Sequence, residues 1–396
     1  MNTTSPRRHA RSSTGRSAGL SAGLSAGLSI GLSAGLLLAT STASGLEPPA
    51  TSPATTPAPA PTTQTLPPAF VREMDGGTVV EQLRAEAAQV LRRVQCDTTR
   101  RLLINTSWLP VIEKRRVHRD KAAGVVLSPA RFDALPAEAK ASFEAVEINE
   151  EFFYFTSYGS PLAYARPLDL VAKQLGCADM LFAGKRILDF GYGGIGHLRL
   201  LASVGAHVTG VEINPLYEAL YSEPGDTGEV PGAGISDPKP PAGSITLVTG
   251  SWPSDPAVTQ RVGGGYDLII SKNVLKKGYI HPAKEVPDRQ RVKLGVDDAG
   301  FLKAVADSLN EGGLFMIYNI CPKQREDKYI PWADGLCPFS REAVAAAGLE
   351  VLAFDVDDSV EVRLLGKALS WDQGQSPMDL ENDCFAWYTL IRKPAK

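Results

Sequence analysis

The chain has 396 residues, of which 43% are hydrophobic and 21% charged, enough to bury the core of one large domain or two modest ones. Its 41 Lys and Arg side chains stand against 44 Asp and Glu, a formal charge of -3. This balance excludes the strongly basic proteins that bind nucleic acid through phosphate contacts, so no nucleic-acid partner is expected.

The N-terminal segment has the layout of an export signal. Four arginines within residues 7–16 precede an uncharged stretch over residues 17–46 that is rich in Ser, Ala, Gly and Leu. The small residues around Ala43 suit signal peptidase, so we predict a signal peptide over residues 1–43 and an exported protein, periplasmic or secreted. An uncleaved membrane anchor is the alternative, because the stretch is long enough to span a bilayer. No other membrane partner is expected.

A Pro-rich segment follows the predicted signal. Residues 46–69 hold eight prolines among Ala and Thr, a composition that buries too little apolar surface to fold. Residues 44–69 are therefore predicted to be a disordered linker. Residues 70–183 are predicted to form a helical cap in front of the main domain, which occupies residues 184–396.

Apolar residues at helical spacing predict cap helices over Thr78–Gln95 and Pro136–Ala145. Ser160–Pro161 resembles an N-cap and first turn, which predicts a broken helix through Leu175. The basic run Lys114–Lys121 is interpreted as a solvated helix face.

Five cysteines are scattered without CxxC spacing, so no metal centre is predicted. Their odd number leaves at least one thiol unpaired in a monomer. Cys321 and Cys337 flank one loop and could form a disulfide, while two free buried thiols are an equal alternative.

The main domain alternates strands and helices, which predicts a parallel, doubly wound sheet. A helix near 340–347 and two strands, Leu349–Asp355 and Phe385–Arg392, close the chain, and the last strand is expected to run antiparallel. The Gly/Pro-rich connection 222–243 is either a lid or a disordered insertion. We expect core strands over residues 185–190, 207–212, 245–250, 266–271 and 313–319, with helices near 196–204, 214–221, 254–261 and 298–310.

A glycine motif marks the first core strand. Gly191, Gly193 and Gly196 follow the spacing G-x-G-x-x-G, which lets the backbone turn tightly and approach a ligand. Glu212 comes 21 residues after Gly191, at the end of the second strand, where a carboxylate can accept both ribose hydroxyls. The pattern predicts an adenosine-containing cofactor.

The segment from Gly184 to about Lys393 resembles a class I S-adenosylmethionine-dependent methyltransferase. Asp189 stands two residues before Gly191, as in the D-x-G-x-G motif of that family, and Glu212 matches its ribose-binding acid. Tyr266–Ser271 matches its fourth strand, and Leu309–Ile317 its double-glycine turn and fifth strand. The chain is also similar to a subgroup of uncharacterised exported bacterial proteins.

This resemblance implies a Rossmann-like, seven-stranded α/β sheet with a reversed C-terminal strand, S-adenosyl-L-methionine as cofactor, and a small-molecule substrate. The adenine would meet Ser251, where the family often has an acid, and stack on Trp252; a buried core tryptophan is an equal alternative. The expected cofactor-binding residues are Asp189, Gly191, Tyr192, Gly193, Gly196, Glu212, Ser251, Trp252 and Ser271.

Catalytic candidates follow the fourth strand, at the edge where open α/β sheets bind ligands. Lys272 and Asn273 are expected to face the transferred methyl group, whereas the lysines at 276 and 277 are expected to face solvent. His281 could act as a general base for a hydroxyl acceptor, although a plain loop histidine is the stronger alternative. The stretch lacks the Asn/Asp-Pro-Pro-Tyr/Phe arrangement, which argues against base methylation and leaves an O or N nucleophile as acceptor.

Two loops are candidates to enclose the site. Tyr329–Phe339 could form a substrate wall with Asp334 as its polar contact, and Tyr158–Ser160 could close over the methionyl end or merely cap a helix.

The alternatives to a methyltransferase are an exported protein that binds the cofactor without catalysis and a nicotinamide-dependent oxidoreductase.

Overall fold

A computed structural model describes residues 77–155, 159–234, 239–374 and 377–395 of the chain. The predicted signal peptide and linker lie outside these residues, as does Tyr158. None of the helices in the described ranges is long and apolar enough to cross a lipid bilayer.

The cap begins with two helices, α1 (Val79–Val90) and α2 (Asp97–Ile104), and a 3-10 turn, η1 (Asn105–Trp108). The Thr78 hydroxyl accepts from the Glu81 backbone N–H while the Glu81 side chain accepts from the Thr78 N–H, a capping box that starts α1. The apolar face of α1 is buried, which confirms the helix predicted from residue 78.

A small antiparallel sheet follows, which the sequence did not predict. Its strands are β1 (Arg115–Asp120), β2 (Val125–Leu127) and β3 (Glu144–Ile148), in the order β2-β1-β3. The basic run predicted to be helical is therefore strand β1, and its Arg119 pairs across the sheet with Glu144 at 2.8 Å. Of the helix predicted over 136–145, only α4 (Ala137–Lys140) forms. Another short helix, α3 (Pro129–Asp133), comes before it.

The approach to the main domain is a broken helix, as predicted. After α5 (Glu150–Phe155), the Ser160 hydroxyl accepts from the Leu162 N–H and starts η3 (Pro161–Tyr164), which continues into α6 (Ala165–Gln174). Pro161 suits the first turn because its missing N–H would have no helical partner there.

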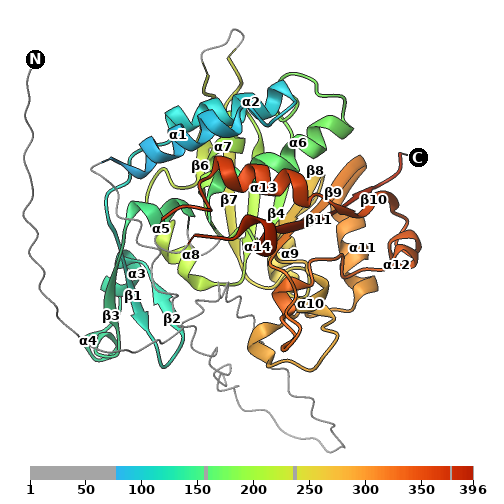
Figure 1. Cartoon of the computed structure of the whole chain (residues 1–396). Helices are drawn as coiled ribbons and strands as arrows, with labels where there is room; N and C mark the ends of the chain where they lie inside the picture. Colours follow the sequence, from blue (N-terminus) through green and yellow to red (C-terminus); the bar gives the residue numbers. More distant parts are fainter. Residues whose placement is uncertain (1–76, 156–158, 235–238, 375–376, 396) are drawn as a thin grey trace, which may run out of the picture.

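The main sheet has eight strands in the order β10-β11-β9-β8-β4-β5-β7-β6 (Figure 1). The five central strands are parallel, and β11 runs antiparallel between β9 and β10. This confirms the doubly wound α/β fold with a reversed last strand. The strands are β4 (Arg186–Phe190), β5 (His207–Glu212), β6 (Gly228–Val230), β7 (Gly243–Thr249), β8 (Tyr266–Lys272), β9 (Leu309–Cys321), β10 (Glu350–Asp357) and β11 (Phe385–Arg392).

The additional strand, β6, lies in the connection expected to be a lid or a disordered insertion. It pairs antiparallel with β7 at the sheet edge. Asp226, two residues before β6 in the chain, is buried, and its carboxylate pairs with Arg115 of β1 at 3.1 Å and with Arg199 at 3.2 Å. The described part of the connection is thus an edge of the sheet, fastened to the cap by ion pairs.

Helices cover both faces of the sheet (Figure 1). One buried cluster joins the sheet to the cap, α7 (Gly196–Ser203), α8 (Pro215–Leu220) and α13 (Ser359–Ala368). The other face packs against α9 (Pro256–Val262), α10 (Lys277–Ile280), α11 (Asp298–Ser308) and α12 (Arg341–Ala346). Helix α13 and the short α14 (Leu380–Asp383) were not predicted. Short 3-10 turns also occur at η4 (Asp288–Gln290) and η5 (Pro331–Ala333).

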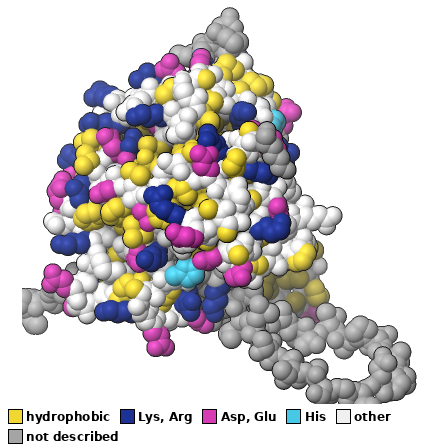
Figure 2. Space-filling view, turned by 90° about the vertical axis from the view of Figure 1, so that its right-hand side faces the viewer, with side chains coloured by type: hydrophobic (Ala, Val, Ile, Leu, Met, Phe, Trp, Pro, Cys, Tyr) yellow, Lys and Arg dark blue, Asp and Glu magenta, His cyan; other side chains and the backbone are white. Residues whose placement is uncertain are grey.

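One disulfide, Cys96–Cys177, joins the start of α2 to the segment after α6. The sequence indicated no pairing between these two positions. Cys321, Cys337 and Cys384 are free and buried, so the alternative of free thiols holds at Cys321 and Cys337. On the face of the molecule that Figure 2 shows, positively and negatively charged side chains are interspersed with apolar ones.

Candidate functional site

The candidate site lies along one edge of the main sheet, where the parallel strands β4, β5, β7 and β8 have their carboxyl ends. Neighbouring strands are in register there, with Asp189 opposite Gly210 and Ile270, and Glu212 opposite Thr249. Open α/β sheets bind ligands at this edge. The predicted residues of the first, second and fourth strands are therefore brought to one place.

The glycine turn after β4 requires glycine at two positions. Gly191 and Gly193 have φ of 76° and 57°, the left-handed region that side chains disfavour. A Cβ on Gly191 would also lie 2.4 Å from Cγ2 of Val274, which follows β8. The turn can thus approach the end of β8 only because position 191 has no side chain.

Two other residues of the motif serve packing. A Cβ on Gly196 would lie 2.8 Å from Cβ of Pro161, so this glycine lets α7 start against η3. The Tyr192 ring is buried above Gly210 and lies 5.9 Å from the Tyr217 ring.

Glu212 meets the glycine turn. Its carboxylate accepts from the backbone N–H groups of Ile213, at 2.8 Å, and Asn214, at 3.2 Å, and the Gly193 N–H also bonds to it. Burial raises the pKa of Glu212 to about 7, against the effect of these three donors. A carboxylate so placed is a strong acceptor for hydroxyl groups brought to the turn.

Asp189 is fully buried and already has partners. Its Oδ2 lies 2.5 Å from Nε2 of His197 in α7, and its Oδ1 accepts from the Tyr164 hydroxyl at 3.5 Å. The His197 and Tyr164 rings stack with centroids 3.6 Å apart. Burial lowers the pKa of His197, so the neutral imidazole donates Nε2–H to the carboxylate. The two oxygens of Asp189 keep further acceptor capacity for the expected contact with the cofactor's ammonium group.

Lys272 belongs to the same buried cluster and is only 4% exposed. Its ammonium lies 5.1 Å from the centre of the Tyr164 ring, a cation–π contact. Burial lowers the pKa of Lys272 to about 8, while the charge of Asp189 opposes the shift. Sequence reasoning missed Tyr164 and His197, because no local pattern signals that either would reach the first strand.

Asn273 has a left-handed backbone, with φ of 67°. Its Oδ1 accepts from the Ile320 N–H at 2.7 Å, which ties the end of β8 to β9. The amide Nδ2 donates to no described residue, so it is the group of Asn273 that a ligand could use. Ser271, by contrast, donates its hydroxyl to the Phe190 carbonyl at 3.1 Å and holds the end of β8 against β4.

Trp252 is a core residue. It is buried with its ring 5.8 Å from Phe190 and 5.5 Å from Phe301, which agrees with the packing alternative. Its indole Nε1 is buried without a hydrogen-bond partner among the described residues. Ser251 beside it is half-buried at the end of β7 and remains the polar candidate for adenine.

His281 agrees with the alternative of a plain loop histidine, whereas Lys276 differs from its expected position. The His281 side chain is 48% exposed and its Nε2 lies 2.9 Å from the Asp298 carboxylate, so it stands on the surface. Lys276 is wrongly predicted to face solvent, since it is 1% exposed. Its ammonium donates to the carbonyls of Ile320, at 2.6 Å, and Trp332, at 3.0 Å, and burial lowers its pKa to about 8.

Hydrogen bonds that do not involve Lys276 also hold the loop after β9, to α10 and to β9 itself. The Gly278 N–H donates to the Asp334 carbonyl at 3.2 Å, and the Asn319 amide donates to the Gly335 carbonyl at 2.9 Å. Burial raises the pKa of Asp334, and Lys277 opposes that shift. The loop expected to form a substrate wall therefore lies beside the end of β8.

No protein-family model matches the chain, and no curated protein matches it in sequence. Solved structures similar to it include S-adenosylmethionine-dependent methyltransferases. A phosphoethanolamine N-methyltransferase 2 of Haemonchus contortus, in complex with S-adenosylhomocysteine, is 13% identical with a TM-score of 0.35, covering 64% of this chain and 63% of that one. TehB of Haemophilus influenzae is 16% identical with a TM-score of 0.32, covering 63% and 69%.

A third similar structure is the [4+2]-cyclase SpnF, 18% identical with a TM-score of 0.32, covering 58% of this chain and 81% of that one. At these scores the likeness concerns the fold class. Activity and ligands have to be inferred from the chain's own residues.

Proposed function

We propose that the chain binds S-adenosyl-L-methionine at the carboxyl edge of its main sheet and transfers the methyl group to an O or N nucleophile of a small molecule. The observation that carries this proposal is the meeting of Glu212 with the Gly193 N–H at the glycine turn. Ribose hydroxyls are donors that suit this buried carboxylate, and Gly193, whose left-handed backbone favours glycine, lies in the turn that would approach the ligand.

When bound, S-adenosylmethionine supplies an electrophilic methyl group, and the protein's task is to align the acceptor and exclude water. The Asn273 Nδ2 can orient an acceptor oxygen or nitrogen at the end of β8. Lys272 and the Asp189–His197 pair form a buried cluster of β8, β4 and α7 residues next to the turn. No covalent enzyme nucleophile is needed.

A second candidate is a protein that binds the cofactor without transferring its methyl group. The observation that favours it is the engagement of the predicted catalytic side chains within the protein: Asn273 Oδ1 with Ile320, and Lys272 with the Tyr164 ring. The two candidates share the Glu212 site and differ only in turnover.

We also propose that the chain is exported after removal of residues 1–43. The charge layout of the N-terminal sequence supports this. The disulfide Cys96–Cys177 supports it as well, because such bonds persist mainly in oxidising compartments. Mass spectrometry of the native protein tests the proposal, and an intact Met1 on exported protein would contradict it.

The cofactor proposal predicts a pH-dependent affinity. Burial raises the pKa of Glu212 to about 7 in the free protein, and hydroxyl donors would favour its charged form. Binding should therefore be strongest above pH 7 and weaken as the pH falls through 7, when Glu212 takes up a proton. Calorimetric titration with S-adenosylhomocysteine at pH 6, 7 and 8 measures this change.

The matched variant is Glu212→Gln, which keeps the shape of the side chain and removes its charge. We expect it to lose about ten- to hundredfold in affinity at pH 8 and to lose the pH dependence that Glu212 contributes. Glu218→Gln, an exposed acid in α8, should bind like the wild type. Equal affinity of Glu212→Gln and Glu218→Gln would contradict the assignment.

A further inference from the structure

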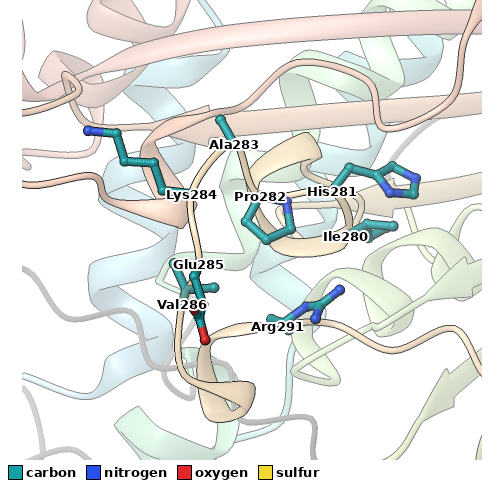
Figure 3. A pocket seen from close by; sticks show the side chains of 8 residues that line it. All are labelled: Ile280, His281, Pro282, Ala283, Lys284, Glu285, Val286 and Arg291. Carbon is teal, nitrogen blue, oxygen red and sulfur yellow. The ribbon is translucent and has the colours of Figure 1, made fainter.

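A hollow opens on the surface where the chain leaves α10. It has a volume of about 450 Å³ and is lined by residues 280–286 and Arg291, here called the Arg291 hollow (Figure 3). Helix α10 directly follows the end of β8, so the hollow lies at the same edge of the sheet as Glu212 and Asn273. It is a separate feature from the glycine turn.

Arg291 enters the hollow without a partner. Its Nε is buried, and no described residue accepts a hydrogen bond from it. The nearby acid Asp288 interacts with the charge of Arg291 at a distance, but its ion pair is with Lys293, at 2.9 Å. Among the described residues the Arg291 side chain also has no ion pair and no aromatic contact.

The backbone holds Arg291 at this position. The Arg291 N–H donates to the Asp288 carbonyl at 3.0 Å, and the next residue, Val292, donates to the Tyr279 carbonyl of α10 at 3.0 Å. Across the hollow, the Ala283 N–H donates to the Tyr329 hydroxyl at 3.1 Å. Both walls of the hollow are thus tied to the loops beside the end of β8.

A guanidinium with a buried, unpaired Nε–H is costly unless an acceptor reaches it. Its planar set of donors suits a carboxylate or a phosphate, which can accept two parallel hydrogen bonds. Lys284 adds a second positive charge to the lining, and His281, which also lines the hollow, is paired with Asp298. The negative charges that oppose an anion are Glu285 in the lining, Asp298 beside His281, and Asp288.

We propose that the Arg291 hollow binds an anionic oxygen group, a carboxylate or a phosphate, carried by the methyl acceptor. As a statement about the acceptor this rests on the proposed function, while the binding of an anion does not. The acceptor would be anchored at Arg291 with its nucleophile directed toward the end of β8.

The test uses the whole chain and two probes, inorganic phosphate and malonate, at constant ionic strength with chloride as the reference. Nuclear magnetic resonance of ¹⁵N-labelled protein follows the Arg291 Nε–H signal, identified by its absence in Arg291→Gln. We expect this signal to shift on addition of phosphate or malonate, and the tighter probe identifies the group. An Nε–H signal that neither probe moves would overturn the proposal.

Matched variants separate the site from general surface charge. Arg291→Gln should weaken anion binding about tenfold or more, whereas Arg289→Gln, an exposed arginine two residues away, should leave it unchanged. Glu285→Gln should bind the anion at least as tightly as the wild type. Equal weakening by Arg291→Gln and Arg289→Gln would overturn the proposal.

Titration of the same samples with S-adenosylhomocysteine keeps the two proposals apart. Arg291→Gln should bind it like the wild type, because the hollow lies apart from Glu212. If the anion binds and S-adenosylhomocysteine does not, the anion site stands and the cofactor proposal fails.

Discussion

At the scale of single residues, two buried lysines near the candidate site differ in what they contact. Lys276 donates to two backbone carbonyls, and its role is to hold the loop after β9. Lys272 has the Tyr164 ring near its ammonium and interacts with the charges of Asp189 and Lys276, but it donates no hydrogen bond to a described residue. Two lysines with similarly lowered pKa values thus serve different purposes, and only Lys272 is placed to act on the first strand.

Lys272→Met is predicted to change how stability depends on pH. The pKa of Lys272 is lowered from 10.5 to about 8 by burial, so the folded protein releases a proton between these values that the unfolded chain keeps. Stability should therefore rise with pH through that window, by on the order of 3 kcal/mol for this lysine. We expect Lys272→Met to lose that part of the rise, as measured by urea unfolding from pH 7 to 10.

Lys276→Met is the comparison. It also loses a titration between about 8 and 10.5, but it leaves the carbonyls of Ile320 and Trp332 without their donor. At pH 7 it should be less stable than Lys272→Met by about 1–3 kcal/mol. Stability in Lys272→Met that rises with pH as steeply as in the wild type would refute the burial of its charge.

At the scale of elements, the site depends on how closely the end of β4 approaches the end of β8. The Ser271 hydroxyl bonds to the Phe190 carbonyl, and Gly191 leaves room for Val274. The glycine motif thus has two functions that a sequence pattern cannot separate. Gly191 and Gly196 let elements pack, while Gly193 lies beside Glu212.

Gly191→Ala is predicted to be destabilising beyond the effect of its backbone angle. Its Cβ would lie 2.4 Å from Cγ2 of Val274, which adds about 1–3 kcal/mol of overpacking. Gly184→Ala is the control, because Gly184 has a similar φ of 71° and no atom within 4 Å of a Cβ. Thermal unfolding of both variants measures the difference, and Val274→Ala should relieve part of it. Equal losses in the two glycine variants would contradict the contact.

At the scale of the whole molecule, a disulfide closes the cap on itself, and one buried apolar cluster joins the cap to the main domain. Cys96 and Cys177 are 81 residues apart and both lie in the cap, whereas Asp226 joins β1 of the cap to α7 through two arginines. Tyr164, which contacts Asp189, comes from the segment just before α6. The cap therefore contributes directly to the candidate site.

Cys96→Ser is predicted to lower the free energy of unfolding by about 2–5 kcal/mol, because the disulfide restricts the unfolded chain. Reducing agent should lower the Tm of the wild type and leave the Tm of Cys96→Ser unchanged. Differential scanning calorimetry, with mass spectrometry to verify reduction, makes the measurement. A fully reduced wild type with an unchanged Tm would show that the bond does not stabilise the fold.

Apart from β6, α10, α13 and α14, the sequence alone determined the order of strands and helices from 185 onward, the antiparallel last strand, and the placement of the glycine turn and Glu212 at one edge. These follow from local periodicity and from the rule that parallel strands end together. The tertiary structure decided which side chains at that edge are open to a ligand. It placed Trp252 in the core, exposed His281, buried Lys276 and joined Asp189 to His197.

The same division holds for the cap and the cysteines. Strand β1 was mistaken for a helix because its charges pair with β3, which is distant in sequence. The partner of Cys96 could not be identified, because pairing depends on where two helices meet. Contacts between residues far apart in the chain leave no local pattern, and for that reason only the folded structure determines the chemistry available at the site.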